Sequence, residues 1–235
     1  MFRKLLLLAA FLLTAGVAVQ AQNIQFHYDF GSQLYKTESV RPKLTTTVEM
    51  FRPDKWGNTF FFVDMNYAEE GINLAYWEIS REIKLGNSPF LAHVEYNGGL
   101  TNGFSFNHNY LAGVTYAWNR PDFQAGFTVT PMFKYLAKQK SPASWQLTGT
   151  WYYHFANGLM TTNGFADIWG DRNYVTGKKN IIFLTEPQIW LNLNKLKGVD
   201  PNFNLSVGSE VEISHNFAVG DKLIVNPTLA AKWTF

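Results

Sequence analysis

Carboxylates and aromatic rings recur along the chain at alternating positions, the spacing that brings side chains to one face of a β-strand. A carboxylate accepts hydrogen bonds from hydroxyl and amino groups, and a flat base stacks on an aromatic ring with roughly 1–3 kcal/mol. These residue types predict a binding site for small polar solutes that carry a flat ring. The carboxylates would bind solute donors and the rings would stack; the leading candidates are Asp64, Glu78, Glu186, Tyr76, Trp169 and Trp190.

The histidines form no catalytic or metal-binding pattern. His154 could act as a general base beside Thr148 or Thr150, but the sequence has no GxSxG motif and no serine at a recognisable spacing from a histidine and an acid. We therefore interpret His154 as a polar lining residue, and we expect no enzyme, no catalytic residue, no metal and no cofactor. Neither an HxH nor an HExxH pair occurs among His27, His93, His108, His154 and His215.

The elements that must position these side chains follow an export signal. Two basic residues precede an apolar run over 5–19 and a small-residue junction at Ala21. The run is shorter than the ~20 residues of a membrane helix, and its pattern is typical of a cleaved signal peptide. We expect residues 1–21 to be removed and residues 22–235 to form a single domain. The sequence contains no cysteine, so we expect neither a lipoprotein anchor nor a disulfide framework.

The composition restricts the class of the exported protein. Charged residues make up 16% of the chain and aromatic residues 17%, whereas soluble domains carry about 25% charged residues. Without the basic residues of the signal the chain is near neutral, which argues against a nucleic-acid partner. After Val19 no stretch approaches ~18 continuous apolar residues. These features together favour a transmembrane β-barrel.

Alternation of apolar and polar residues predicts about twelve β-strands. We therefore predict an all-β protein, a transmembrane antiparallel β-barrel in the outer membrane. Short connections at 119–121 and 156–158 suit one end of the barrel, and the longer 32–42 and 170–179 suit the other. The strands are expected at 24–31, 43–51, 59–67, 74–85, 90–98, 104–118, 122–137, 144–155, 161–169, 180–193, 202–217 and 221–235.

The last of these strands shows the lipid-facing side most clearly. A soluble β-sandwich is the alternative, but several predicted strands exceed the usual ~5–6 residues. Tryptophan and tyrosine also gather near their ends, as at a membrane interface. Phe235 resembles the C-terminal signature that outer-membrane barrels present to the barrel-assembly machinery, so that machinery and outer-membrane lipid are expected partners. The apolar face consists of Leu223, Val225, Leu229, Ala231, Trp233 and Phe235.

The opposite faces of the strands predict an acidic lumen. Such a lumen repels phosphates and admits neutral or cationic solutes. Alternation would direct Arg81 towards lipid, so we expect a β-bulge or a position near the interface to turn it inward beside Glu78. Alternatively, rings and acid–base pairs fill the interior of a barrel that conducts nothing. Four lysines (Lys43, Lys84, Lys134 and Lys232) oppose nine carboxylates: Asp29, Glu49, Asp64, Glu78, Glu82, Glu95, Glu186, Glu210 and Glu212.

Three short motifs resemble those of a known family. They are Phe60-Phe61-Phe62-Val63-Asp64, Trp77-Glu78-Ile79-Ser80-Arg81, and Gly164-Phe165 followed by Asp167 and Trp169-Gly170. With them the chain resembles the Tsx-like nucleoside-specific channel-forming outer-membrane proteins, in particular the Bacteroides-type outer-membrane barrel family related to them. The resemblance implies a twelve-stranded monomer with a narrow, aromatic-bearing lumen, and it adds Arg81 and Asp167 to the solute-binding residues.

We therefore predict an outer-membrane channel for passive diffusion of small polar solutes, with nucleosides as the leading class. The alternative is a lumen-filled barrel that acts as an envelope enzyme hydrolysing lipids or esters, or as a structural or binding protein. The predicted lumen site consists of Asp64, Tyr76, Glu78, Arg81, Asp167, Trp169, Glu186 and Trp190.

Overall fold

The computed structural model describes residues 22–36, 41–172, 179–217 and 222–235, and the expected signal peptide lies outside these ranges. No helix in them is both long enough and apolar enough to cross a membrane. Two short helical segments, α2 (Gly31–Leu34) and η2 (Leu193–Lys195), lie in connections. The strands are β1 (Gln22–Asp29), β2 (Leu44–Pro53), β3 (Gly57–Ala68), β4 (Gly71–Lys84), β5 (Phe90–Thr101), β6 (Asn109–Asn119), β7 (Ala125–Leu136), β8 (Ala143–Phe155), β9 (Met160–Arg172), β10 (Lys179–Thr185), β11 (Gln188–Asn192), β12 (Leu205–His215) and β13 (Leu223–Thr234).

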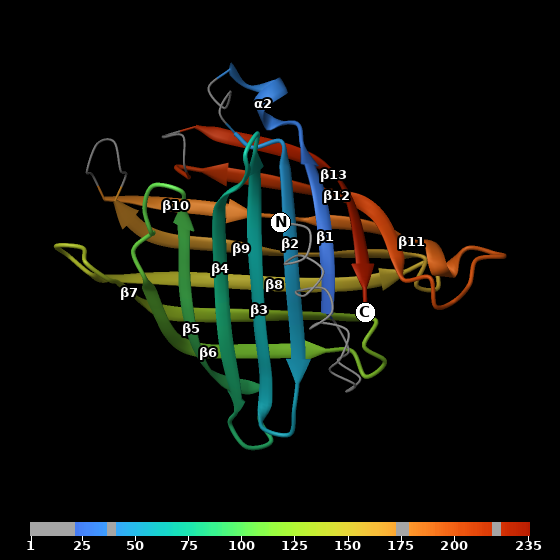
Figure 1. Cartoon of the computed structure of the whole chain (residues 1–235). Coiled ribbons are helices and arrows are strands. Elements are labelled where there is room, and N and C mark those ends of the chain that lie inside the picture. Colours follow the sequence, from blue (N-terminus) through green and yellow to red (C-terminus); the bar gives the residue numbers. More distant parts are fainter. Residues whose placement is uncertain (1–21, 37–40, 173–178, 218–221) are drawn as a thin grey trace, which may run out of the picture.

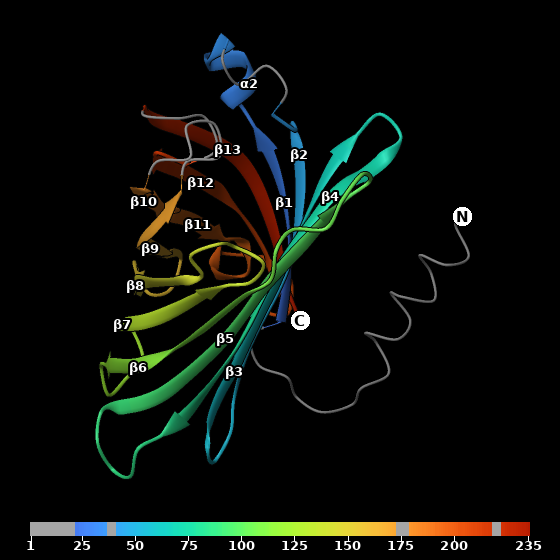
Figure 2. The ribbon, with the colours of Figure 1, turned by 90° about the vertical axis from the view of Figure 1, so that its left-hand side faces the viewer.

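The strands close into an antiparallel barrel because the last one pairs with the first. β13 is hydrogen-bonded to β1 on one side and to β12 on the other. β10 and β11 both pair with β9 and β12, so the thirteen described strands occupy twelve positions around the barrel. In Figure 1, β1 to β4 run nearly vertically in front and β7 to β9 run across behind them, as expected for strands tilted around a barrel. Figure 2 shows the curved wall from the side.

The strand expected at 180–193 is interrupted in the structure. Glu186 and Pro187 separate β10 from β11, because proline has no N–H to donate to the ladder. Opposite the break, a Cβ atom on Gly164 of β9 would lie 2.6 Å from the carbonyl oxygen of Glu186. The two backbones therefore approach this closely only because residue 164 is glycine.

Several strands begin later than the alternation predicts, among them β6 and β7. The segment expected at 122–137 starts as β7 at Ala125, since Phe123 has a φ of 53° and belongs to the preceding turn. The segment expected at 104–118 starts as β6 at Asn109. Before it the chain folds back, and the Phe106 N–H donates a 2.8 Å hydrogen bond to the carbonyl of Gly99.

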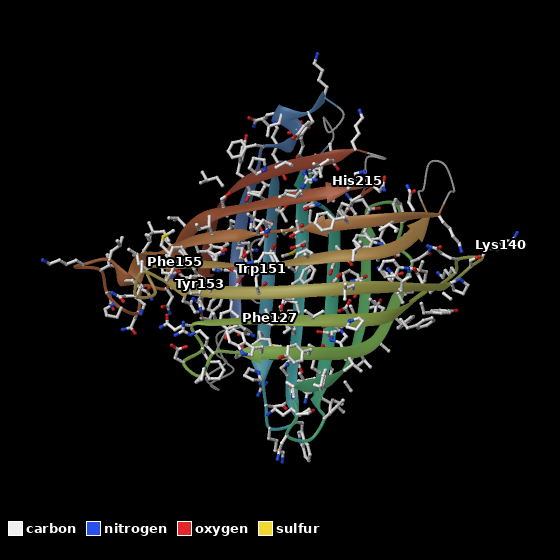
Figure 3. The ribbon with its side chains drawn as sticks, turned by 180° about the vertical axis from the view of Figure 1, so that it is seen from behind. Phe127, Lys140, Trp151, Tyr153, Phe155 and His215 are labelled. Carbon is white, nitrogen blue, oxygen red and sulfur yellow. The ribbon has the colours of Figure 1, made fainter. Side chains whose placement is uncertain are left out.

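The two faces of the strands differ as predicted. On β13, Leu229 is 63% exposed on the outer face, whereas Asn226 on the inner face is fully buried. Polar faces therefore line the lumen and apolar faces surround the barrel. On β1 the buried residues are likewise polar: Asn23, Gln25, His27 and Asp29. Figure 3 shows the wall of β7 and β8 from outside, with Phe127, Trp151 and Tyr153 along it.

The antiparallel order separates the connections into two ends. We call the end that holds the expected connections 119–121 and 156–158 the turn end, and the opposite one the loop end. The expected long connections 32–42 and 170–179 lie partly outside the described residues. The turn end carries 54–56, 85–89, 120–124, 156–159 and 193–204, and the loop end carries 30–36, 41–43, 69–70, 102–108 and 137–142.

Candidate functional site

Three carboxylates from different strands form the first acidic group of the lumen. Glu78 of β4 interacts electrostatically with Glu95 of β5, with Asp167 of β9 and with Lys134 of β7. β4 and β9 lie five positions apart in the barrel of twelve, so these groups come from opposing walls. Charges on opposing walls are therefore close enough to act on one another across the lumen.

A second acidic group lies across the lumen between β3 and the break in the wall. Glu186 interacts electrostatically with Asp64 of β3 and with Glu210 of β12. Asp64 accepts a hydrogen bond from Thr47 Oγ1 at 2.5 Å, and Glu210 accepts one from Gln188 Nε2 at 2.6 Å. We call these two groups together the acidic lining: Glu78, Glu95, Asp167, Asp64, Glu186 and Glu210. The predicted acidic interior is therefore present as a set of neighbouring carboxylates.

A ladder of aromatic rings runs beside the acidic lining on β3 and β4. The ring centroids of Phe60 and Phe62 are 6.1 Å apart, and those of Phe62 and Tyr76 are also 6.1 Å apart. All three side chains are half-buried, so part of each ring remains accessible. The Tyr76 hydroxyl donates a 2.6 Å hydrogen bond to Glu78 Oε1. A stacking surface and a hydrogen-bond acceptor are therefore adjacent on one wall.

The two tryptophans predicted to stack on solute are packed against the wall. Trp190 is 0% exposed, its Nε1 donates to Gln188 Oε1 at 2.9 Å, and the Lys232 ammonium lies 4.1 Å from its ring centroid. Trp169 is also buried, with the Lys134 ammonium 4.9 Å from its ring centroid. Both lysines make cation–π contacts that cover these rings. Of the three rings predicted to stack on solute, Tyr76 in the β3–β4 ladder is therefore the accessible one.

A histidine between two carboxylates braces the wall between β4 and β5. His93 Nδ1 is 3.2 Å from Glu82 Oε1, and its Nε2 is 3.1 Å from Glu95 Oε2. Thr115 Oγ1 donates to the same Glu82 oxygen and lies 2.9 Å from Thr130 Oγ1. The sequence places Glu82 and Glu95 in the lumen, but the role of His93 emerges only from the register that pairs it with Glu82.

Arg81 does not lie beside Glu78, which corrects the expectation for this residue. It pairs in register with Thr59 and Val94 without a bulge and stays on the outer face. At the turn end its guanidinium donates to both carboxylate oxygens of Asp54, at 2.7 and 3.0 Å, and to Thr59 Oγ1 at 3.1 Å. The hydrogen bonds from Arg81 lower the pKa of Asp54 to about 2. Arg81 therefore avoids lipid by pairing at the rim, outside the lumen.

Arg41 brings a positive charge to the loop end of the lumen. Its Nε donates to Asp29 Oδ2 at 2.9 Å and its Nη2 donates to Glu212 Oε2 at 2.6 Å. No sequence pattern predicts this contact, because strand alternation does not apply to the expected connection 32–42. Lys43 and Lys84, which we expected in the lumen, are exposed at the barrel ends.

His154 does not bond to either of its expected hydroxyl partners. Its Nδ1 lies 2.9 Å from Thr161 Oγ1 of β9, while Thr150 Oγ1 lies 2.7 Å from Thr128 Oγ1. Throughout the described residues, no group of three or more histidine and carboxylate side chains is placed to hold a metal ion. The geometry of the site is therefore that of hydrogen-bonding and stacking groups around a narrow polar passage.

The sequence matches one protein family over almost its whole length. The family is described as a domain of unknown function (DUF5020), and the match covers residues 21–235. The chain belongs to the DUF5020 family. No curated protein matches the DUF5020 chain.

Solved structures similar to the DUF5020 chain include porins. The NanC porin superposes with a TM-score of 0.56 at 11% identity, covering 92% of this chain and 100% of that chain. The KdgM porin gives a TM-score of 0.52 at 11% identity, covering 91% and 98%. A KdgM porin in complex with disordered oligogalacturonate gives 0.51 at 11% identity, covering 91% and 98%. The DUF5020 chain therefore has the fold of an outer-membrane porin, and its apolar outer face and closed barrel place it in the outer membrane.

Proposed function

We propose that this DUF5020 protein is a channel for passive diffusion of small polar solutes, with nucleosides as the leading class. The observation that carries the proposal is the accessible ladder of Phe60, Phe62 and Tyr76 beside Glu78. A base stacked on such a ladder gains roughly 1–3 kcal/mol. That interaction is strong enough to select a solute and weak enough to release it.

The charge of the lumen supports neutral or cationic solutes. One similar porin structure contains oligogalacturonate, an oligosaccharide whose sugars carry carboxylates. The acidic lining of the DUF5020 chain would repel such a polyanion, because a narrow lumen with low-dielectric walls focuses the field of its charges. The shared fold therefore does not extend to a shared solute, and a nucleoside fits this lumen better than a nucleotide.

The ribose and the base would use different parts of the site. Glu78 and, across the lumen, Asp64 and Glu186 accept hydrogen bonds from ribose hydroxyls or from the amino groups of the base. Phe62 and Tyr76 stack on the base. The roles predicted for Trp169 and Trp190 require the lysine that covers each ring to move aside. Asp167 acts within the first acidic group.

The remaining features of the proposal follow from the sequence. The chain would be exported by the signal peptide at 1–21, would be inserted by the barrel-assembly machinery through the strand that ends at Phe235, and would function as a monomer in outer-membrane lipid. No catalytic step is part of this function.

Planar-bilayer recording tests the channel. We expect the purified protein to give conductance steps that adenosine and thymidine reduce, and we expect Tyr76→Ala to weaken the block about tenfold, since it removes one stacking ring. Trp56→Ala removes a ring from the turn end outside the lumen and should leave the block unchanged. The absence of steps, or steps that neither nucleoside reduces, would overturn the proposal.

The packing of the lumen supports a second candidate, a filled barrel that serves as an envelope enzyme or as a structural or binding protein. Trp190 is completely buried and the wall networks are extensive. If this candidate is correct, bilayers stay silent. An enzyme would also hydrolyse lipids or esters, and His154→Ala would abolish that turnover.

A further inference from the structure

A cavity of about 510 Å³ lies at the turn end of the barrel. Its lining includes His154, Lys195 and Lys232, which we call the basic vestibule. Among the described residues that line the cavity, Asp122 is the one with a carboxylate. Arg120 donates hydrogen bonds to its two oxygens, at 3.0 Å to Oδ1 and 2.9 Å to Oδ2. The described lining of this cavity is therefore richer in basic than in acidic side chains, unlike the acidic lining.

Lys232 is the member of the basic vestibule nearest the centre of the barrel. Its ammonium lies over the Trp190 ring, and within the described ranges no carboxylate oxygen lies within 4.0 Å of it. Glu49 and Glu210 act on it only at longer range. An ammonium has three N–H donors, and the ring covers one side of it. Lys232 can therefore donate to an anionic group in the cavity.

The wall beside Lys232 is fixed by hydrogen bonds between its own polar groups. Asn192 Nδ2 donates to the Gly158 carbonyl at 2.8 Å and to Thr161 Oγ1 at 3.0 Å, and Ser206 Oγ donates to Asn192 Oδ1 at 2.8 Å. Ser206 is the register partner of Lys232 across β12 and β13. The vestibule is thus held in place before a solute arrives, which lowers the entropy lost on binding.

A free anion would have to cross the acidic lining to reach the vestibule from the loop end. A solute with both charges can do so, because its cationic group is attracted where its carboxylate is repelled. Glu210 lies four residues along β12 from Ser206, a rise of about 13 Å. Glu210 nevertheless acts electrostatically on Lys232, and the charged ends of an extended dipeptide lie about 7 Å apart.

From this arrangement we propose that the basic vestibule and Glu210 together bind a dipolar solute, with its carboxylate at Lys232 and Lys195 and its cationic group at Glu210. Short peptides are the chemical class that fits. The inference rests on the proposed channel, since it names a second class of solute for the same lumen.

Ligand-observed NMR on the full mature chain in detergent micelles tests the inference without a current measurement. The probes are glycylglycine, which carries both charges, acetate, which carries only the carboxylate, and glycinamide, which carries only the amine. We expect glycylglycine to bind more tightly than either of the other two. Equal binding of glycylglycine and acetate would overturn the assignment of a dipolar solute.

Lysine variants locate the site. Lys232→Gln should weaken glycylglycine binding about tenfold, the loss of one charge-assisted hydrogen bond, and leave glycinamide binding unchanged. Lys232→Arg keeps the charge and should retain most of the affinity, which separates lost binding from lost folding. Lys197→Gln removes an exposed lysine from the same connection, 193–204, and is the matched control. Equal affinity of Lys232→Gln and Lys197→Gln for glycylglycine would overturn the site.

Failure of the inference and failure of the channel can be told apart. A protein that conducts in bilayers but does not distinguish the three probes overturns the dipolar site and retains the channel. A protein that binds the probes in the expected order but passes no current retains the site and overturns the channel.

Discussion

The Tyr76 hydroxyl donates a 2.6 Å hydrogen bond to Glu78 Oε1, two residues further along β4. Residues two apart on a strand share a face, so both side chains face the lumen. The Tyr76 ring also lies 6.1 Å from Phe62. One carboxylate of the acidic lining is therefore held beside the accessible rings, where a solute with a flat ring and donors would meet both.

Neutralising Glu78 should lower the preference of the channel for cations. A unit charge about 7 Å from the path of an ion contributes about 0.6 kcal/mol in a water-like dielectric. This contribution has opposite signs for cations and anions, so we expect Glu78→Gln to reduce the ratio of cation to anion permeability about sevenfold, measured from the reversal potential in a salt gradient. Glu69→Gln makes the same change in the exposed connection between β3 and β4 and serves as control. A similar shift in both variants would show that Glu78 does not govern selectivity.

Removing the Trp190 ring should widen the lumen and weaken the barrel. The ring packs on β12, where a Cβ on Gly208 would lie 2.8 Å from Trp190 Cε3. We expect Trp190→Ala to raise the single-channel conductance and to lower the free energy of unfolding by about 3–5 kcal/mol. Trp56 is 64% exposed at the turn end, so Trp56→Ala should change neither quantity. Unchanged conductance in Trp190→Ala would mean that another part of the wall limits the passage.

A charge on the outer face should destabilise the barrel in lipid. Leu229 is 63% exposed on β13 and Leu34 is 57% exposed on α2, outside the strands. A lysine facing the middle of the bilayer costs about 2–4 kcal/mol. We expect this loss of unfolding free energy in vesicles for Leu229→Lys and little change for Leu34→Lys. Equal stability of the two variants would contradict the assignment of the outer face to lipid.

Acid should break the contact between Asp54 and Arg81 only at low pH. The hydrogen bonds from Arg81 lower the pKa of Asp54 to about 2 in the folded protein, below the ordinary value of about 3.9. The pair therefore stabilises the folded state above pH ~4, and this contribution is lost as the pH falls towards about 2. Carboxyl NMR of Asp54 should show this midpoint, and Arg81→Gln should raise it. A wild-type midpoint near 4 would mean that the pair does not form.

Alternation alone predicted most of the fold. It assigned the inner and outer faces of β1 and β13 and the acidic character of the lumen, because these depend only on which side of a strand each residue occupies. It missed the break at Glu186 and Pro187, since a close approach to Gly164 of β9 is a property of two paired strands. Alternation correctly placed Arg81 on the outer face of β4. The further expectation that Arg81 turns inward was wrong, because Asp54 supplies a partner at the rim.

The candidate site was less predictable than the fold. The alternation of side chains identified Trp190 and Tyr76 as rings on the inner face. It could not show that Lys232 covers the Trp190 ring while the Tyr76 ring stays accessible. Such distances depend on the register of every strand around the closed barrel. Arg41 lies in a connection, where side-chain direction has no fixed period, so no sequence signal placed it between Asp29 and Glu212.

The pairing of β1 with β13 joins residues 23–29 to residues 228–234. During synthesis β1 emerges first, and its outer hydrogen-bonding edge stays unpaired until β13, the last strand, is in place. An unpaired edge of this kind is prone to aggregate with other chains, and the ring closure that removes it spans nearly the whole polypeptide, which makes it slow. The edge of β1 therefore stays open to such contacts until β13 pairs with it.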